Sequence, residues 1–229
     1  MRLDVPLELN PGDPLFPARL LSIPDPPARL YVAGDPAVLG VPGIAVIGTR
    51  SPSAYGEAMG TRLSRTVAKA GLCIVSGLAE GCDTAAHTVA VRLGTPTVAI
   101  LPGGTDRIFP PENEGLARAI VDSGGAVLSE YPPGTDPEEE YFGARDRLQS
   151  GLSLGVIVIE TDIESGTLIT VGHARRQGRP IAVLATHPPE YRELPSFQGN
   201  KQLLDDGEVF PIRNLEEGKE WLTKWTRIG

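Results

Sequence analysis

The sequence predicts an α/β protein in which helices cover both faces of a doubly wound, mainly parallel sheet. Short apolar runs recur from residue 44 onward, and each run is continuous instead of alternating with polar residues. Amphipathic segments of helical length separate these runs. Strands covered on both faces have this continuous pattern, and their alternation with helices is typical of parallel sheets.

Six apolar runs are predicted to form strands and five amphipathic segments to form helices. The predicted strands are residues 44–48, 72–77, 96–101, 125–130, 155–160 and 179–185. The predicted helices are residues 55–70, 83–93, 112–123, 143–153 and 167–177. Because aromatic residues make up only 5% of the chain, beside 27 glycines and 22 prolines, we expect an aliphatic core and frequent turns.

The flanks of this region are less regular. Residues 1–38 contain several prolines and one predicted strand, RLYVAG. We expect this strand at an edge of the same sheet. Residues 1–38 are therefore predicted to pack on the core and not to form a separate helical domain. Residues 214–229 are predicted to form a C-terminal helix. Asn214 is its predicted N-cap, because Glu217 follows three residues later.

Composition narrows the possible classes of protein. The chain has 229 residues, of which 41% are hydrophobic. Its formal net charge of -8 argues against a protein whose whole surface binds nucleic acid, but it does not exclude a local basic groove. Cys73 and Cys82 fit neither a disulfide framework nor the spacing of metal ligands, and no signal segment opens the chain. No apolar run approaches the roughly 20 residues of a membrane helix. We therefore expect a cytoplasmic protein without membrane insertion, metal or cofactor.

The loops that follow the predicted strands carry glycines, hydroxyl groups and an arginine. In parallel sheets these loops meet at one edge, where ligands bind. Glycine lets the backbone approach an anion, and helix N-terminal amides and hydroxyl groups donate to it. Taken singly, each loop is equally consistent with a tight turn that needs glycine. The loop residues predicted to contact a phosphate are Gly48, Thr49, Arg50, Ser51, Ser76, Gly77, Gly81, Gly103, Gly104, Ser165, Gly166, Thr167 and Thr170.

Asp83 and His87 lie one turn apart at the start of a predicted helix. This spacing is compatible with a general acid and base. We favour a structural interpretation, in which the carboxylate faces the helix dipole and the histidine bonds a neighbouring loop. No nucleophile or set of metal ligands lies near these residues in the sequence.

Three further cations are candidates for the strand ends. Arg145 and Arg147 are two residues apart in ARDRLQSGLS, and Lys201 follows a glycine-asparagine pair. With Arg50, they are the cations expected to face a ligand, although a solvated surface explains each of them equally well. Asp146 lies between the two arginines and reduces the local positive charge.

Seven motifs occur in this order along the chain: VIGTRSPSAYG, VSGLAEGCDTAAH, ILPGGTDRIFPPENEGL, LSEYPPGT, SGLSLGVIVIE, ESGTLIT and GNKQLL. Together they resemble the Rossmann-like domain of the DNA-processing protein A (DprA, or Smf) family, and the resemblance extends from about Phe16 to Arg213. The resemblance implies an extended Rossmann-like fold, with residues 39–213 as its core. It also implies a non-enzymatic protein of natural transformation that binds single-stranded DNA in a basic pocket, loads the recombinase RecA and forms a homodimer.

The resemblance also assigns site residues and exposes departures from the family pattern. Asp146 replaces the usual asparagine between the two arginines, which predicts weaker binding of a DNA backbone. We expect a core without the additional N-terminal helical domain and C-terminal winged-helix-like domain of many members. The aromatic residues expected near the strand ends are Phe109, Tyr131, Tyr141 and Phe142. The positions that match family motifs are Gly48, Thr49, Arg50, Ser51, Ser76, Gly77, Gly81, Asp83, His87, Arg145, Arg147, Ser165, Gly166, Thr170 and Lys201.

A protein that binds or hydrolyses a small nucleotide at the same edge is the alternative hypothesis. PGGTDRIFPPENE is similar to the PGGxGTxxE loop of phosphoribohydrolases, but Thr105 and Asp106 replace the required Gly-Thr, and Glu112 and Glu114 come too late. No catalytic residue is therefore predicted. A dehydrogenase is discarded, because the chain has neither the dinucleotide glycine fingerprint nor an acidic residue after the second predicted strand.

Overall fold

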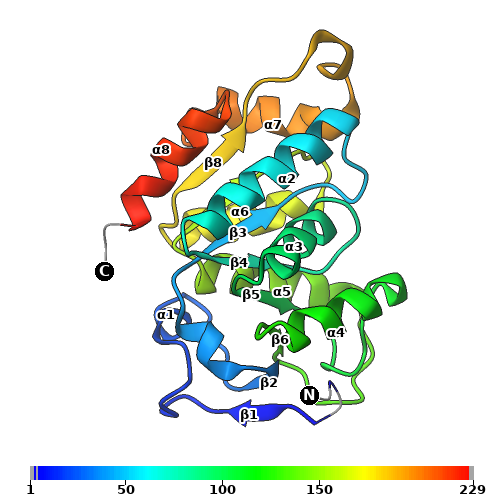
Figure 1. The fold of residues 1–229 in the computed structure, drawn as a ribbon, viewed down its shortest axis with the longest axis vertical. Coiled ribbons are helices and arrows are strands. Elements are labelled where there is room, and N and C mark those ends of the chain that lie inside the picture. Colours follow the sequence, from blue (N-terminus) through cyan, green and yellow to red (C-terminus); the bar gives the residue numbers. More distant parts are fainter. Residues whose placement is uncertain (1–2, 4, 227–229) are drawn as a thin grey trace.

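One twisted sheet with helices on both faces organises the chain, as the computed structural model shows for residues 3 and 5–226 (Figure 1). The strand order is β1-β2-β6-β5-β4-β3-β7-β8-β9. β2 pairs antiparallel with both β1 and β6, and all other neighbours are parallel. The strands are β1 (Leu7–Leu9), β2 (Leu30–Gly34), β3 (Gly43–Ile47), β4 (Cys73–Ser76), β5 (Thr97–Ile100), β6 (Ala126–Ser129), β7 (Gly155–Val158), β8 (Ile181–Leu184) and β9 (Phe210–Ile212).

The helices divide between the two faces of the sheet. The α-helices are α1 (Ala18–Leu21), α2 (Ala54–Lys69), α3 (Cys82–Leu93), α4 (Glu114–Asp122), α5 (Glu139–Leu152), α6 (Gly166–Arg176), α7 (Pro195–Asp205) and α8 (Leu215–Thr226). Short 3₁₀ helices are η1 (Pro36–Gly40), η2 (Pro111–Asn113) and η3 (Pro189–Tyr191). α2, α3, α4 and α8 pack on one face, and α1, α5, α6 and α7 pack on the other.

Successive strand residues explain why both faces are covered. In β3, Ile44 and Val46 pack against α2, whereas Ala45 and Ile47 pack against α6, and all four are buried. Because side chains alternate across a strand, burial of both sets needs a helical layer on each side. The predicted doubly wound α/β fold is confirmed.

Each of the six predicted strands and five predicted helices corresponds to an element of the structure, and the differences lie at the flanks. The RLYVAG strand was expected at a sheet edge, but β1 lies outside β2, so this prediction is wrong. β1 and β9 have three residues each, too few to show a periodic pattern. α5 begins at Glu139, four residues before the predicted start at 143, and therefore includes Phe142. The predicted cap of α8 is confirmed, because Glu217 N donates to Asn214 Oδ1 at 3.0 Å.

A buried asparagine on α7 holds the ends of two neighbouring strands. Asn200 Nδ2 donates to the carbonyl oxygens of Ile159 at 2.8 Å and Leu184 at 2.9 Å. Its Oδ1 accepts from Thr161 N at 2.8 Å. A Cβ at Gly199 would lie 2.5 Å from a carbonyl oxygen of the loop after β7, so only glycine permits this close approach. α7 therefore fixes the carboxyl ends of β7 and β8.

We predict that Asn200→Ala lowers the free energy of unfolding by about 3 kcal/mol, because it leaves buried backbone groups without partners. Urea denaturation measures this loss. Asn214→Ala removes an exposed helix cap and should cost only about 1 kcal/mol. Equal losses in the two variants would contradict the role assigned to Asn200.

Candidate nucleic-acid interface

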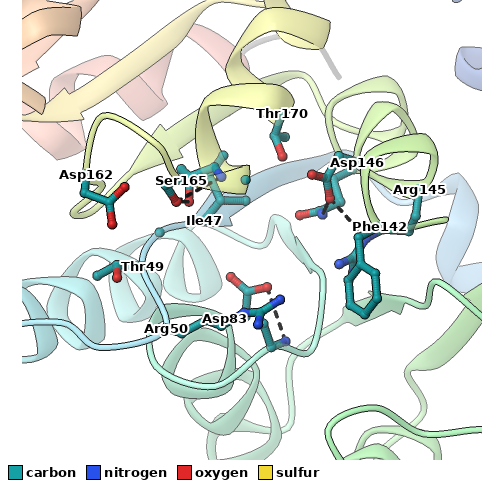
Figure 2. A pocket seen from close by; sticks show the side chains of 15 residues that line it. Ile47, Thr49, Arg50, Asp83, Phe142, Arg145, Asp146, Asp162, Ser165 and Thr170 are labelled. Carbon is teal, nitrogen blue, oxygen red and sulfur yellow. Dashed lines mark hydrogen bonds and ion pairs between the residues drawn. The ribbon is translucent and has the colours of Figure 1, made fainter. Parts of the chain in front are cut away.

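A cavity of about 300 Å³ lies beyond the carboxyl ends of β3 and β7, where α3, α5 and α6 meet (Figure 2). Nine of the predicted site residues come together here, from loops and helices far apart in the sequence. They are Gly48, Thr49, Arg50, Asp83, Arg145, Ser165, Gly166, Thr167 and Thr170. Ile47, Ala79, Phe142, Asp146, Gln149 and Asp162 complete the lining.

Arg50 is the exposed cation of this cavity. Its guanidinium carbon lies 5.8 Å from the ring centroid of Phe142, within the range of a cation–π contact. Phe142 in turn makes an edge-to-face contact with Phe109, with ring centroids 5.5 Å apart. These three side chains also line a smaller neighbouring cavity of about 210 Å³. Among the residues that the structure describes, no carboxylate forms an ion pair with Arg50.

Arg145 reaches the same cavity, but protein groups already occupy part of its guanidinium. Its Nη1 donates to Gly77 O at 2.7 Å and also to Ile100 O. Its Nε lies 3.1 Å from Asp146 Oδ1, an ion pair without the angle of a hydrogen bond. Only 5% of Arg145 is exposed, so its guanidinium interacts mainly with the strand ends and little with solvent.

Three carboxylates counter the positive charge of the cavity. Burial raises the pKa of Asp83 to about 6, although Arg145 and backbone amides, including Gly77 N at 3.0 Å, oppose this rise. Burial also raises the pKa of Asp146, against the effect of Arg145. Figure 2 shows Asp83, Asp146 and Asp162 around the space that Arg50 enters. The cavity is therefore polar and nearly balanced in charge, not strongly basic.

Arg147 and Lys201 were expected to face the strand ends, but neither lines the cavity. Arg147 Nη1 and Nη2 form a bidentate pair with Glu130 at 2.5 and 2.6 Å, and its Nε donates to Asp25 O at 2.9 Å. Two residues on a helix lie about 200° apart, so Arg145 and Arg147 point in different directions. Lys201, which lies on α7, forms an ion pair with Glu193 at 3.1 Å. These two cations do not meet Arg50.

Four of the predicted loop residues also lie outside the cavity. Ser51 is exposed beside it. Ser76 is buried, and its hydroxyl donates to Val46 O at 2.7 Å. The loop with Gly103 and Gly104 packs against residues 132–137, where Gly104 N donates to Thr135 O at 2.9 Å. These residues shape the strand ends without facing the ligand space.

Two other glycines support the cavity from neighbouring positions. Gly77 lines the smaller cavity and accepts the hydrogen bond from Arg145. Gly81 has a φ of +73°, and a Cβ there would lie 2.5 Å from Arg50 O. Only glycine combines this conformation with this contact. Gly81 therefore lets the start of α3 approach the loop that carries Arg50.

His87 has a structural environment. It is fully buried, and its Nδ1 lies 2.8 Å from Thr97 Oγ1, which itself donates to Ile74 O. Burial lowers the pKa of His87 to about 3, so the ring is neutral at physiological pH. His87 therefore has a structural role, but its partner belongs to β5 and not to a neighbouring loop as expected. Within residues 3 and 5–226, no three His, Cys, Asp or Glu side chains cluster as metal ligands, and no helix is long and apolar enough to cross a bilayer.

Sequence reasoning missed a buried carboxylate next to the cavity. Glu160 follows β7 and has no exposed side-chain surface. Its carboxylate accepts from Ser53 N at 2.7 Å, from Ser53 Oγ at 2.6 Å and from His187 Nε2 at 2.5 Å. The N-terminus of α2 therefore already binds the carboxylate of Glu160. The N-terminus of α6, in contrast, faces the cavity. The only signal in the sequence was the acid that directly follows the apolar run GVIVI.

We predict that Glu160 contributes stability that is lost in acid. Burial raises its pKa, but hydrogen bonds from His187 and Ser53 outweigh that effect, so its pKa lies below the ordinary 4.5. The contribution is present above that pH and disappears as the pH falls through the lowered pKa. Urea denaturation from neutral to acidic pH should show a shallower loss of stability for Glu160→Gln than for the unchanged protein. Glu220→Gln, on the exposed surface of α8, serves as the control, and equal slopes in all three would contradict the prediction.

Comparisons with known proteins agree with the fold and the motifs. The sequence matches the family model of DNA recombination-mediator protein A over residues 9–220. Protein Smf of Synechocystis is 40% identical over 187 residues, which are 80% of this chain and 47% of that relative. Protein Smf of Escherichia coli is 36% identical over 221 residues, 93% of this chain and 58% of that relative. The chain thus spans about half the length of these curated relatives.

Solved structures with the same fold include two family members. DprA from Streptococcus pneumoniae has a TM-score of 0.85 and 31% identity, covering 98% of this chain and 75% of that one. DNA processing protein A from Helicobacter pylori, whose structure addresses its single-stranded DNA binding mode, has a TM-score of 0.84 and 31% identity, covering 98% and 99%. A molybdenum cofactor carrier protein from Chlamydomonas reinhardtii, at 20% identity and a TM-score of 0.52, shares the fold alone. The family match and the curated relatives show that this chain belongs to the DNA processing protein A (DprA/Smf) family.

Proposed function

We propose that this chain binds single-stranded DNA at the carboxyl edge of its sheet and that it catalyses no reaction. One observation carries the proposal: Arg50 lies at the mouth of a polar cavity, over the ring of Phe142, with no carboxylate partner among the described residues. An unpaired guanidinium beside an aromatic ring suits a ligand with both phosphates and bases. The Helicobacter pylori relative, a single-stranded DNA binding protein of the same fold, supports this assignment.

The surroundings of Arg50 suggest where each part of a DNA strand would lie. The N-terminus of α6, with Ser165 as its cap and Gly166 and Thr167 in the lining, favours an anion through its dipole and its amides. A phosphate between this helix and Arg50 would avoid the buried carboxylates behind. Aromatic rings near the rim would stack on bases in a way that tolerates any sequence. Besides the contact of Phe109 with Phe142, Tyr131 and Tyr141 stack with centroids 4.1 Å apart.

The titratable groups near the cavity support the proposal that the chain catalyses no reaction. Asp83 already accepts hydrogen bonds from backbone amides, and His87 is neutral and buried against Thr97. The hydroxyl groups beside them, those of Ser76 and Thr97, are buried and donate to backbone carbonyl oxygens of neighbouring strands, so neither is presented to the cavity as a nucleophile.

Family membership suggests the wider role of the protein. We propose that it acts in DNA uptake and natural transformation, loads the recombinase RecA, and functions as a cytoplasmic homodimer. We also propose that the predicted site residues that line the cavity, together with Phe142, contact DNA, and that Arg147 and Lys201 serve the fold instead.

A small nucleotide remains the competing ligand, and the dimensions of the cavity favour it. About 300 Å³ is at the lower end of small-molecule sites, and the three carboxylates could accept hydrogen bonds from a base. A thermal-shift comparison of nucleotides with oligo-dT distinguishes the two ligands, because a ligand that binds the folded protein raises its melting temperature. Stabilisation by mononucleotides or dinucleotides but not by oligo-dT would replace the DNA proposal.

We predict that Arg50→Ala weakens binding of oligo-dT at low salt by about tenfold, and reduces the salt dependence of binding by about one counterion. Fluorescence anisotropy with labelled oligo-dT measures both effects. Arg65→Ala is the matched control, because Arg65 is exposed on α2, the helix that follows the loop with Arg50, but about three turns from the start of that helix. Equal losses in both variants, or no binding by the unchanged protein, would reject the proposed site.

We predict that Asp146→Asn binds oligo-dT at least as tightly as the unchanged protein, with a gain of up to about fivefold. The substitution removes one negative charge from the cavity, worth roughly 1 kcal/mol at contact distance in water. The same anisotropy titration tests it, with Glu220→Gln on α8 as the control for net charge. A clear loss of affinity in Asp146→Asn alone would show that the carboxylate itself contacts the ligand.

A further inference from the structure

The loop that carries Arg50 is attached at both ends to a single residue. We call residues 48–53 the Arg50 loop. Near its start, Thr49 N donates to Glu160 O at 2.6 Å. At its end, Ser53 N and Ser53 Oγ donate to the Glu160 carboxylate at 2.7 and 2.6 Å. Because Arg50 lies between these attachments, its position depends on the position of Glu160.

His187 is the remaining partner of that carboxylate. Its Nε2 lies 2.5 Å from Glu160 Oε1, and both side chains are fully buried. Its ring stacks on Phe197 with centroids 3.7 Å apart and contacts Tyr55 at 5.0 Å. The second ring nitrogen has no hydrogen-bond partner among the described residues. The contact with Glu160 is thus the only polar interaction described for the imidazole.

The packing leaves the carboxylate little freedom while His187 is present. A Cβ at Gly56 would lie 2.3 Å from Glu160 Cδ, so the carboxylate rests directly on the backbone of α2. The imidazole closes the other side. Removal of the ring would open space there and allow Glu160 to turn away from Ser53.

We infer that His187 is a positioning residue, which fixes the Arg50 loop through Glu160 and thereby sets the affinity of the cavity for single-stranded DNA. This inference rests on the proposed function, because it concerns the affinity of the same site. His187 itself does not line the cavity. Its influence passes through two hydrogen-bonded residues to Arg50.

A double-mutant cycle with oligo-dT tests this coupling. In the unchanged background, His187→Ala should weaken binding about tenfold, the usual order of a coupling between sites. In the Arg50→Ala background, it should cause little further loss, because the loop no longer carries the cation. His187→Gln keeps an N–H donor at a similar reach and should restore most of the affinity. His173→Ala removes a partly buried histidine that pairs with Arg176, and should leave binding unchanged.

The outcomes separate the inference from a purely structural role and from the proposed function. All titrations are made well below the melting temperature of each variant. A lowered melting temperature with unchanged affinity, or equal losses in both backgrounds, would overturn the inference. If His187→Ala does not fold, Glu160→Gln takes its place in the cycle with the same expectations. The glutamine keeps one acceptor oxygen for the groups around it and loses the other. Failure of the unchanged protein to bind oligo-dT would reject the proposed function itself.

Discussion

An ionised carboxylate without partners is too costly to bury, so Glu160 requires the three donors that surround it. Two come from Ser53 and one from His187, and Asn200 fixes the backbone on either side of the same strand end. These bonds join the ends of β3, β7 and β8 through side chains. They fix these strand ends next to the loops that line the cavity.

The same arrangement decides which groups are available to a ligand. The internal carboxylate occupies the start of α2, and strand-end carbonyls occupy Nη1 of Arg145. Arg50, the rest of the Arg145 guanidinium and the N-terminus of α6 then remain as the groups of the cavity that favour an anion. With Asp83, Asp146 and Asp162 close by, the proposed binding of a phosphate depends on the position and direction of these donors more than on net positive charge. A site confined to one edge of the sheet is compatible with the overall charge of -8.

Much of the fold could be predicted because it depends on local patterns. Continuous apolar strands such as IAVI and GVIV need helices on both faces, and all six such runs are strands of the parallel region. Short elements such as β1 escaped prediction because three residues carry no period. The strand-end rule likewise located seven of the residues that line the cavity, since loops after parallel strands meet at one edge whatever their sequences.

The sequence by itself determined the layers of the fold, the family and the edge of the sheet where the cavity lies. Only the tertiary structure decided which charges are free there. Arg145 and Arg147 look alike in sequence, yet helical geometry sends one to strand-end carbonyls and the other to Glu130. Glu160 and His187 stand 27 residues apart and meet only because β7 and β8 are neighbours. Pairing between charges depends on directions and distances across the fold, which a linear pattern of residues does not contain.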